Sequence, residues 1–469
     1  MSKTGVIVAL VFAVVLAGAA FFVTNRKTPP VEQGPLLKFD PAKAVEVRIT
    51  APDGAYQAIQ RQPSSGEWDV VIAAPGGKEV GRWPAAPTQV RAALRILSTL
   101  EPTRSADSGT ALGPDAHVVS VKQDNGISSE LRLAARGLAG SVLANAGDRA
   151  GMVGADVAAM LIASGPREWR DRSVLPAFGP DVSRITLRGQ SGTVALARVQ
   201  GRWGLREPIQ APAEADSVGK LLAMLGNVNI TDFLDRGPPP DTGLDSPVAE
   251  LVIESDSRPE GGGPVTTLRR GLSVGRQADI GGKTVFVAID RPGGEPRIVA
   301  VTAESLASIH TEPAFYVSRR SIEAPAIEVG RAGIEFAVAP YPGSDAPVPQ
   351  LPARGPLELT RSVSGWQTAS GSAALPADAE GMKALLTLLG LASAESVLLD
   401  APAHALRIAS VDLKTIGDTP IGVVEIGMLV DPVEGQSRAG RVFTKSGSVF
   451  RVYSQEAGQP VAAWLLSRS

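Results

Sequence analysis

A threefold internal repeat constrains this chain more than any other feature of its 469 residues. In each copy, a strand-like segment ends in an aliphatic residue, a variable residue and arginine, and a short turn then places glycine just before tryptophan. The three occurrences are Ile59-Gln60-Arg61 with Gly66-Glu67-Trp68, Leu196-Ala197-Arg198 with Gly201-Arg202-Trp203, and Leu359-Thr360-Arg361 with Gly365-Trp366. Because a recurring pattern indicates a recurring structural unit, the sequence predicts three similar modules.

The segments on either side of this motif repeat as well. An alternating apolar segment, suited to a half-buried strand, precedes it, and a proline-rich turn followed by apolar residues at helical spacing comes after it. The strand residues are Val45, Val47 and Ile49; Val182, Ile185 and Leu187; and Ile334, Phe336 and Val338. The helix residues are Val90, Leu94, Leu97 and Leu100; Val218, Leu221, Leu222 and Leu225; and Met382, Leu385, Leu386 and Leu389.

Further strands complete each copy. They are predicted at 117–121, 248–253 and 405–408, then at 131–133, 272–275 and 424–427, with a closing strand such as 285–287 or 449–452 and a short helix. Arg172-Ser173-Val174 and Arg320-Ser321-Ile322 end the first two copies. We therefore predict an α+β chain of mostly antiparallel sheet with one packed amphipathic helix per module, the modules covering 38–176, 177–323 and 324–469.

The recurrent tryptophan and arginine have two possible roles each. Tryptophan directly after a glycine turn and opposite an apolar strand indicates a ring that fills the core, and the alternative is a platform for a ligand. The recurrent arginine is expected to reach from its strand to a carboxylate or a backbone carbonyl.

An apolar segment predicts a membrane anchor near the N-terminus. Residues 5–23 carry no charge and lie between Lys3 and Arg26-Lys27, and their number matches the hydrocarbon thickness for a helix. A cleaved signal peptide with Ala17-Gly18-Ala19 as its site is the alternative, although the apolar stretch continues through Val23. Residues 24–37 contain three prolines and predict a stiff spacer. We expect a single-pass inner-membrane protein whose C-terminal part faces the periplasm or the exterior, with the bilayer itself as a partner through residues 5–23.

Composition excludes several classes of function. Lys and Arg number 46 and Asp and Glu 48, with no basic run along a predicted helix, so nucleic acid is not an expected partner. The chain has no cysteine, which rules out disulfide scaffolds, thiolate zinc sites and cysteine nucleophiles. No cofactor site is predicted.

One motif matches a catalytic pattern. Gly271-Leu272-Ser273-Val274-Gly275 fits the nucleophile elbow of α/β-hydrolases, and Asp290 and His310 follow in the required order. The elbow needs a turn from strand into helix, whereas the segment after Ser273 is strand-like. In the repeat, Leu272-Ser273-Val274 also aligns with Leu131-Arg132-Leu133 and Val424-Glu425-Ile426, which predicts an outward strand position for Ser273.

The remaining polar features indicate no site. His117, His310 and His404 are far apart, and a metal site would have to gather them from different modules; His117 and His404 are interpreted as one shared structural position. Gly261-Gly262-Gly263 lacks the lysine of a phosphate loop and predicts a flexible insertion within 255–267, with 340–356 as the matching loop of the third module. No catalytic or metal-binding residue is predicted.

Together, the anchor, Leu37-Lys38-Phe39-Asp40-Pro41 before a strand, the Gly-x-Trp turn, the leucine-rich helix and Trp169-Arg170-Asp171-Arg172 resemble the bacterial domain-of-unknown-function 4340 family. The resemblance implies a membrane-anchored envelope protein associated with ABC-type export systems of the kind linked to gliding motility, and the family supplies no established catalytic residues. We therefore expect a non-enzymatic envelope scaffold whose partners are membrane or envelope proteins such as a transporter permease. The alternatives are a module that binds envelope polysaccharide or peptide, with Trp83 or Tyr316 lining a groove, and a serine hydrolase at Ser273.

Overall fold

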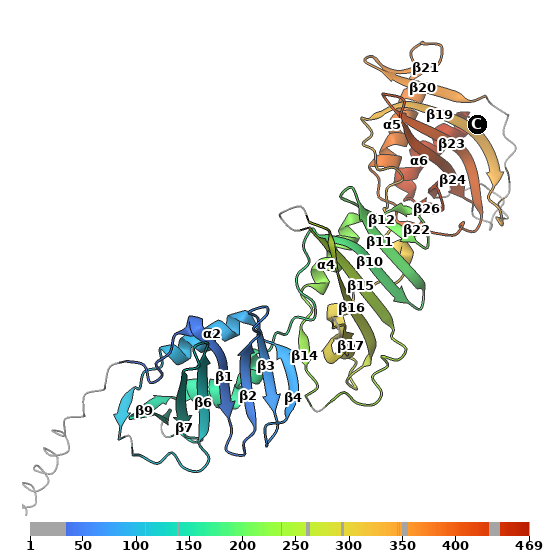
Figure 1. Cartoon of the computed structure of the whole chain (residues 1–469). Helices are drawn as coiled ribbons and strands as arrows, with labels where there is room; N and C mark the ends of the chain where they lie inside the picture. The colour runs from blue at the N-terminus through green and yellow to red at the C-terminus, as the bar shows by residue number, and fades with distance from the viewer. Residues whose placement is uncertain are drawn as a thin grey trace, which may run out of the picture. The chain divides into compact units, whose positions relative to one another are not determined.

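The computed structural model describes residues 34–107, 109–137, 140–235, 237–258, 263–291, 295–344, 346, 348, 355–430 and 441–468. The chain divides into two compact units, Met1–Arg172 and Ser173–Ser469 (Figure 1). The first unit holds one sheet and the second unit holds two.

The first sheet has nine strands in the order β4-β3-β2-β1-β6-β7-β8-β9-β5. The strands are β1 (Ala44–Thr50), β2 (Tyr56–Arg61), β3 (Trp68–Ala73), β4 (Glu79–Pro84), β5 (Arg104–Ala106), β6 (His117–Gln123), β7 (Ser128–Leu133), β8 (Ser141–Ala146) and β9 (Arg149–Gly154). The helical elements are η1 (Pro41–Lys43), α2 (Pro87–Ser98), α3 (Ala155–Ala158), η2 (Ala159–Ser164) and η3 (Pro166–Trp169).

The second sheet repeats this order strand for strand, as β13-β12-β11-β10-β15-β16-β17-β18-β14. Its strands are β10 (Val182–Gly189), β11 (Gly192–Val199), β12 (Arg202–Glu207), β13 (Ala211–Pro212), β14 (Ile230–Asp232), β15 (Ala249–Ser257), β16 (Thr266–Gln277), β17 (Thr284–Ile289) and β18 (Arg297–Thr302). The helical elements are α4 (Ala215–Leu225), η4 (Ala303–Leu306) and η5 (Pro313–Phe315).

The third sheet has eight strands, in the order β21-β20-β19-β23-β24-β25-β26-β22. They are β19 (Val329–Pro340), β20 (Leu357–Ser362), β21 (Gly365–Thr368), β22 (Ser396–Leu398), β23 (Ala405–Thr415), β24 (Pro420–Leu429), β25 (Val442–Ser446) and β26 (Val449–Val452). An isolated bridge between Gln367 and Ala373 stands where the first two sheets have β4 and β13. Helices α5 (Pro376–Gly390) and α6 (Gln455–Arg468) contact each other, and α6 also contacts β23 and β25 (Figure 1).

All three sheets share one topology. A meander of strands leads into the helix, which carries the chain to a short strand at the opposite edge (β5, β14 or β22), and a second meander then returns from the middle of the sheet to that edge. Each strand pair in the described residues is antiparallel. The predicted α+β class, with mostly antiparallel sheet, is confirmed. None of the helices in the part of the chain that the structure describes is long and apolar enough to cross a membrane, and the predicted anchor at 5–23 lies outside that part.

The helix of each module buries its apolar face in the core, as its spacing predicts. In the first module, Val90, Leu94 and Leu97 pack in one cluster with strand residues that include Val47 and Ile59. In α4 the buried residues are Val218, Leu221 and Leu225, and in α5 they include Met382, Leu385 and Leu389. Burial of each such side chain stabilises the fold by about 1.5–3 kcal/mol.

A β-bulge recurs at the same place in the first strand of every module. The register between the first strand and its central neighbour shifts between Ala44 and Glu46, between Val182 and Arg184, and between Val329 and Arg331. The extra residue changes which side chains face the core, so the buried positions are 44, 47 and 49; 182, 185 and 187; and 329, 332 and 334. The predicted alternation therefore fails at Val45 of the first module, which is half-buried, whereas in the third module Ile334 is buried and the half-buried Phe336 and Val338 pack against the same core.

Two other expectations about elements are corrected, and the edge strands were not predicted. The edge strands β5, β14 and β22 are too short to show an alternating pattern. The segment around 258–265 joins β15 to β16, whereas 341–356 joins β19 to β20, so these connections are not equivalent. Residues 285–287 lie in β17, which corresponds to β25, whereas 449–452 is β26 and corresponds to β18.

Candidate functional site

The recurrent arginine and tryptophan are direct cross-strand partners in all three modules. Arg61 pairs with Trp68, Arg198 with Trp203, and Arg361 with Trp366. Each arginine donates to backbone carbonyls: Arg61 Nε to Gly66 O (3.3 Å), Arg198 Nη1 to Pro180 O (2.8 Å) and Arg361 Nη1 to Ala326 O (3.2 Å). The prediction that this arginine reaches a carbonyl is confirmed, and its hydrogen bonds hold neighbouring backbone segments in place.

The three tryptophans also have matching surroundings. Each is half-buried, and Trp68 and Trp366 pack against the cores of their modules. The carbonyl of each accepts a hydrogen bond from an alanine N–H just before the helix: Ala85 to Trp68 (2.8 Å), Ala213 to Trp203 (3.1 Å) and Ala374 to Trp366 (2.9 Å). The recurrent turn thus connects the meander to the start of the helix.

In the first unit, the segment Trp169-Arg170-Asp171 pairs with the outer edge of this region. The Ala86 N–H donates to Trp169 O (2.7 Å), and the Asp171 N–H donates to Pro84 O (2.8 Å). Ala85 and Arg170 form an antiparallel bridge between these two hydrogen bonds. The Trp169 ring is 4% exposed and belongs to the core.

The second module has the same pairing at the equivalent residues. The Glu214 N–H donates to Tyr316 O (2.7 Å), the Ser318 N–H donates to Pro212 O (2.9 Å), and Ala213 forms a bridge with Val317. We call Trp169–Asp171 and Tyr316–Ser318 the closing segments. Each makes one isolated antiparallel bridge at its sheet edge, and a buried aromatic residue at the end of a short 3-10 helix comes just before the bridge residue.

The burial of Tyr316 corrects one expectation. Its side chain is 0% exposed, and burial raises its pKa to about 12, so it cannot line a groove for a ligand. Trp83 is half-buried, with the Arg170 guanidinium 6.0 Å from its ring centre. Trp203 lines a pocket in the second unit.

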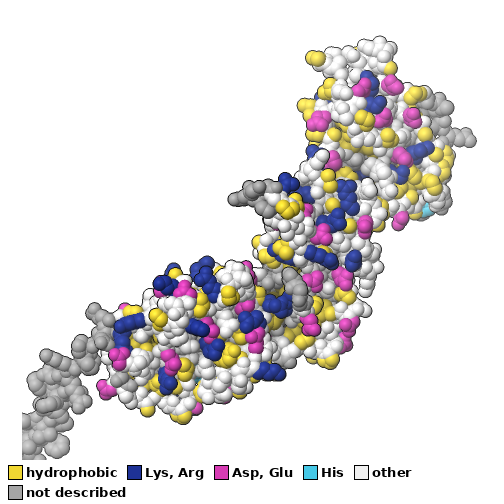
Figure 2. Space-filling view, in the orientation of Figure 1, with side chains coloured by type: hydrophobic (Ala, Val, Ile, Leu, Met, Phe, Trp, Pro, Cys, Tyr) yellow, Lys and Arg dark blue, Asp and Glu magenta, His cyan; other side chains and the backbone are white. Residues whose placement is uncertain are grey.

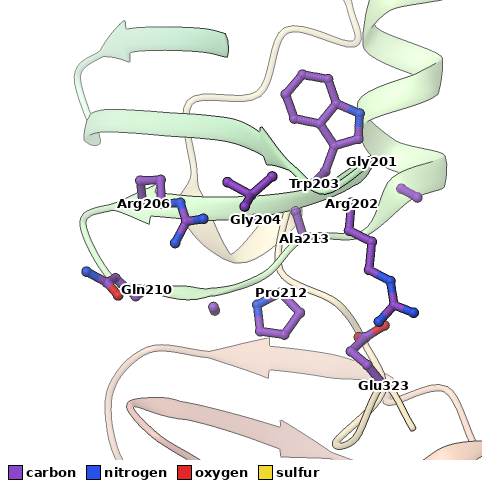
Figure 3. Close-up of a pocket in the computed structure, with 12 residues that line it drawn as sticks. Gly201, Arg202, Trp203, Gly204, Arg206, Gln210, Pro212, Ala213 and Glu323 are labelled. Atoms are coloured by element: carbon purple, nitrogen blue, oxygen red, sulfur yellow. The ribbon is translucent and has the colours of Figure 1, made fainter. Parts of the chain in front are cut away.

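This pocket lies beside β12 and β13 and has a volume of about 700 Å³ (Figure 3). Its polar lining comes from Arg202, Arg206, Gln210 and Glu323, all of them exposed, and the ring of Trp203 contributes apolar surface. Arg202 and Glu323 extend toward each other, and Trp203 points toward α4 (Figure 3). The sequence repeat marks Trp203, but Glu323, the last residue of the predicted second module, has no local signal.

A second pocket of about 440 Å³ shares Gln210, Pro212 and Glu323 with the first and reaches Arg451. Arg451 is 1% exposed, and burial lowers its pKa. It donates from Nε to Ser318 O (2.8 Å) and from Nη1 to Ser446 Oγ (2.7 Å). Arg451 forms no ion pair with any described residue. Its buried positive charge is therefore stabilised by hydrogen bonds to a backbone oxygen and a hydroxyl oxygen.

Buried hydroxyls continue this polar network. Ser321 Oγ lies 2.5 Å from Thr444 Oγ1 and 2.6 Å from the Tyr453 hydroxyl. The Ser321 N–H and the Ile322 N–H both donate to Leu389 O, at the end of α5 (3.1 Å each). The network therefore holds the segment after Tyr316–Ser318 against the third module, and a structural role accounts for these polar groups.

A further polar cluster lies around Glu425 in the third module. Its carboxylate accepts from the Tyr341 hydroxyl and from Lys445 Nζ (3.1 Å for the latter). Burial would raise the pKa of Glu425, but the hydrogen bonds from Tyr341 and Lys445 outweigh it and lower that pKa. Tyr341 also contacts Phe443 and Phe450, which with Ala405 and Val452 make a small separate apolar cluster.

Ser273 lies within a continuous strand. It is half-buried in β16 and pairs with Glu250 on one side and Ala288 on the other. The strand continues to Gln277 and the next element is β17, so the strand-to-helix turn of a nucleophile elbow is not present at Ser273. Asp290 lies against Gly271, and the His310 ring stacks on Phe315 with centres 3.8 Å apart.

The histidines do not share a position. His117 begins β6, whereas His404 precedes β23 in a left-handed conformation with φ 55°. The common register, Val119 with Leu131 and Val411 with Val424, places Ala409 where the first module has His117. Within the described ranges, no cluster of three His, Asp or Glu side chains is arranged to hold a metal ion.

Charges of both signs are mixed over the face shown in Figure 2. Lys and Arg lie among Asp and Glu in the first unit and in both sheets of the second (Figure 2). The net charge of the whole chain is −2.

Comparison with protein families gives one match. Residues 78–247 match the family model described as Domain of unknown function (DUF4340). This confirms the resemblance predicted from the sequence. Neither the curated proteins nor the solved structures include a match to the chain.

The DUF4340 match extends from the edge strand β4 of the first module into the connection before β15 of the second. It includes α2, the first closing segment and Trp203, and it excludes Leu37–Pro41 and Trp68. The first closing segment, which includes three of the four residues of the predicted Trp-Arg-Asp-Arg motif, thus lies within the matched region.

Proposed function

We propose that this chain is a non-enzymatic scaffold of the bacterial envelope whose repeated modules bind an extended segment of a partner protein. One observation carries the proposal: two modules each bind a short segment at the same sheet edge, through the same two backbone hydrogen bonds and an antiparallel bridge. A fold that uses this edge twice within one chain offers it as a general way of binding. Strand addition gives affinity through the main chain, and side-chain pockets give selectivity.

The envelope location rests on the apolar segment 5–23 and the spacer 24–37. A membrane anchor followed by three modules suits an accessory subunit of a membrane complex, and an ABC-type export system of the kind linked to gliding motility is the proposed setting. The position of Ser273 inside a strand supports a binding role over serine-hydrolase chemistry.

Affinity purification of the full chain from membranes in mild detergent tests this function. We expect recovery of a membrane or envelope protein in constant proportion, and the purified pair should form the same complex again. The control is the same preparation without the tagged chain, together with an unrelated membrane complex that must survive the detergent. If that complex survives and the full chain still recovers no partner, the scaffold function is refuted.

The pocket beside Trp203 favours a second candidate, a binding module for envelope polysaccharide or peptide. The pocket is lined by the Trp203 ring and by the exposed Arg202 and Arg206, which suits a ligand that has an apolar face and carboxylate groups. Titration of the full chain with an oligogalacturonate and with an acidic peptide would show binding that Trp203→Ala removes. Trp366→Ala is the matched control, because Trp366 has the equivalent position in the third module and does not line the pocket.

A further inference from the structure

The third module has the sheet edge that the first two modules use, without a strand on it. In each module, one alanine N–H donates to the carbonyl of the recurrent tryptophan. When the three modules are aligned on this alanine, Ala374 is equivalent to Ala85 and Ala213. Leu375 then stands where the first two modules have Ala86 and Glu214, and Ala373 stands where they have Pro84 and Pro212. A proline or alanine begins the helix at the next position in each case, at Pro87, Ala215 and Pro376.

The two backbone groups that would hold a closing segment have no partner among the described residues. The bridge between Gln367 and Ala373 is made by the hydrogen bonds Ala374 N–H to Trp366 O (2.9 Å) and Thr368 N–H to Ser372 O (2.9 Å). The N–H and carbonyl of Ala373 therefore point away from β21. No described residue donates to Ala373 O or accepts from the Leu375 N–H.

The surface beside these groups is apolar. Leu375 is 56% exposed, and Trp366 in the adjacent strand is half-buried. In the first two modules, an aromatic ring of the closing segment is buried beside the same part of the sheet: Trp169 is 4% exposed and Tyr316 is 0% exposed.

We propose that this edge of the third module binds an extended segment of a partner protein that carries an aromatic residue. The carbonyl of the aromatic residue accepts from the Leu375 N–H, and the N–H two residues later donates to Ala373 O. The occupant is assigned from the first two modules, where Trp169–Asp171 and Tyr316–Ser318 meet these requirements. The inference rests on the proposed scaffold function and names the surface that performs it.

A peptide with the sequence of residues 313–322 is the probe, because it contains a known closing segment. Hydrogen exchange of the full chain is measured with the peptide at up to millimolar concentration. We expect slower exchange in the fragment that contains Ser372 to Pro376. A matched peptide with proline in place of Ser318 lacks the second hydrogen-bond donor and should give no protection.

Leu375→Pro is the test in the protein. Leu375 has φ −57°, which proline adopts without strain, so this variant removes the N–H and keeps the backbone path. We expect peptide affinity to fall at least about tenfold, which corresponds to about 1.4 kcal/mol. Leu375→Ala keeps the N–H, and its affinity should fall less than that of Leu375→Pro.

Several outcomes would overturn the proposal. One is protection by the peptide that Leu375→Pro leaves unchanged. Another is a concentration-dependent dimer that Leu375→Pro abolishes, which would make a second copy the occupant. A third is slow hydrogen exchange at residues 372–376 of the full chain when no peptide is present, if Leu375→Pro abolishes it. That result would assign the edge to a segment of this chain.

The purification experiment separates this inference from the scaffold function. If Leu375→Pro recovers the same partner as the unmodified chain, the edge assignment fails and the scaffold function stands. If neither protein recovers a partner while the peptide still binds at 372–376, the scaffold function fails and the edge remains a peptide site.

Discussion

The contact between α5 and α6 allows a sharp test of the packing of the third module. Gly381 lies on the face of α5 that touches α6, and a Cβ atom at this position would overlap the ring of Trp464. Trp464 is 6% exposed, and its Nε1–H donates to Asp378 Oδ1 (3.3 Å). A rigid ring that is buried and hydrogen-bonded cannot give way as the end of a flexible side chain does.

Gly381→Ala therefore sets two effects against each other. Alanine in place of glycine favours the helix by about 1 kcal/mol. Forcing an extra carbon into a packed core costs about 1–3 kcal/mol, and complete loss of the packing of a buried tryptophan costs about 3–5 kcal/mol. The steric cost is the larger, so we expect a net loss of about 2 kcal/mol in the stability of the third module.

Gly219→Ala is the matched control. Gly219 also lies inside a helix, α4, and a Cβ atom there meets no other atom within 4 Å. Without a clash, only the helix preference remains, and stability should rise by up to about 1 kcal/mol. Hydrogen exchange of fragments from α5 and from α4 reports each helix separately, which avoids assuming one transition for the whole chain. Equal stabilisation by the two variants would refute the packing argument.

Three further outcomes are expected. Ser273→Ala should leave labelling by a serine-directed probe unchanged, because Ser273 lies inside a strand. Because Ser273 is only half-buried, the variant should alter the free energy of unfolding by less than about 0.5 kcal/mol. Since the pKa of Glu425 is lowered in the fold, its contribution to stability is present above the ordinary value of 4.5 and lost as the pH falls through the lower, folded-state pKa. Thermal unfolding of Glu425→Gln between pH 7 and pH 3 should accordingly depend less on pH than that of the unmodified chain. Thr444→Val should cost about 1–3 kcal/mol in urea unfolding of the second unit, because it removes a partner from a buried hydroxyl network.

The sequence predicted the elements whose signals are local. In α2, the spacing of Val90, Leu94 and Leu97 is that of one helix face, and all three are buried. The motif of arginine and tryptophan also has a local cause, because a hairpin joins the two residues and makes them cross-strand partners. Patterns of this kind depend on a few neighbouring residues, and one sequence is enough to show them.

Other features could not be predicted because an alternating pattern assumes an uninterrupted strand. The bulge in the first strand of each module adds one residue and reverses the alternation. In the third module, this makes Val329, Ala332 and Ile334 the buried positions. In the first module, Val45 fits the alternation with Val47 and Ile49, but the bulge places Ala44 in the core and leaves Val45 half-buried.

The closing segments lay beyond sequence reasoning for a different reason. Trp169-Arg170-Asp171 and Tyr316-Val317-Ser318 share only an aromatic first residue, and their hydrogen bonds come from the backbone. Each pairs with residues about a hundred positions earlier in the chain, so no local periodicity marks it. Glu323 was missed for the same reason, because it lines the pocket beside Trp203 from a segment that is distant in sequence.

The second closing segment joins two sheets within the second unit through one short stretch of chain. The Ser318 N–H donates to the carbonyl of Pro212 in the second module. The Ser318 carbonyl accepts a hydrogen bond from the buried Arg451 in the third module. Three residues later, Ser321 donates to Leu389 at the end of α5. Removing only the guanidinium would leave the carbonyl of the buried Ser318 without its Arg451 donor, and such a group costs about 1–3 kcal/mol. The same residues therefore close one sheet and anchor the next, which explains why a buried charge is retained at this place.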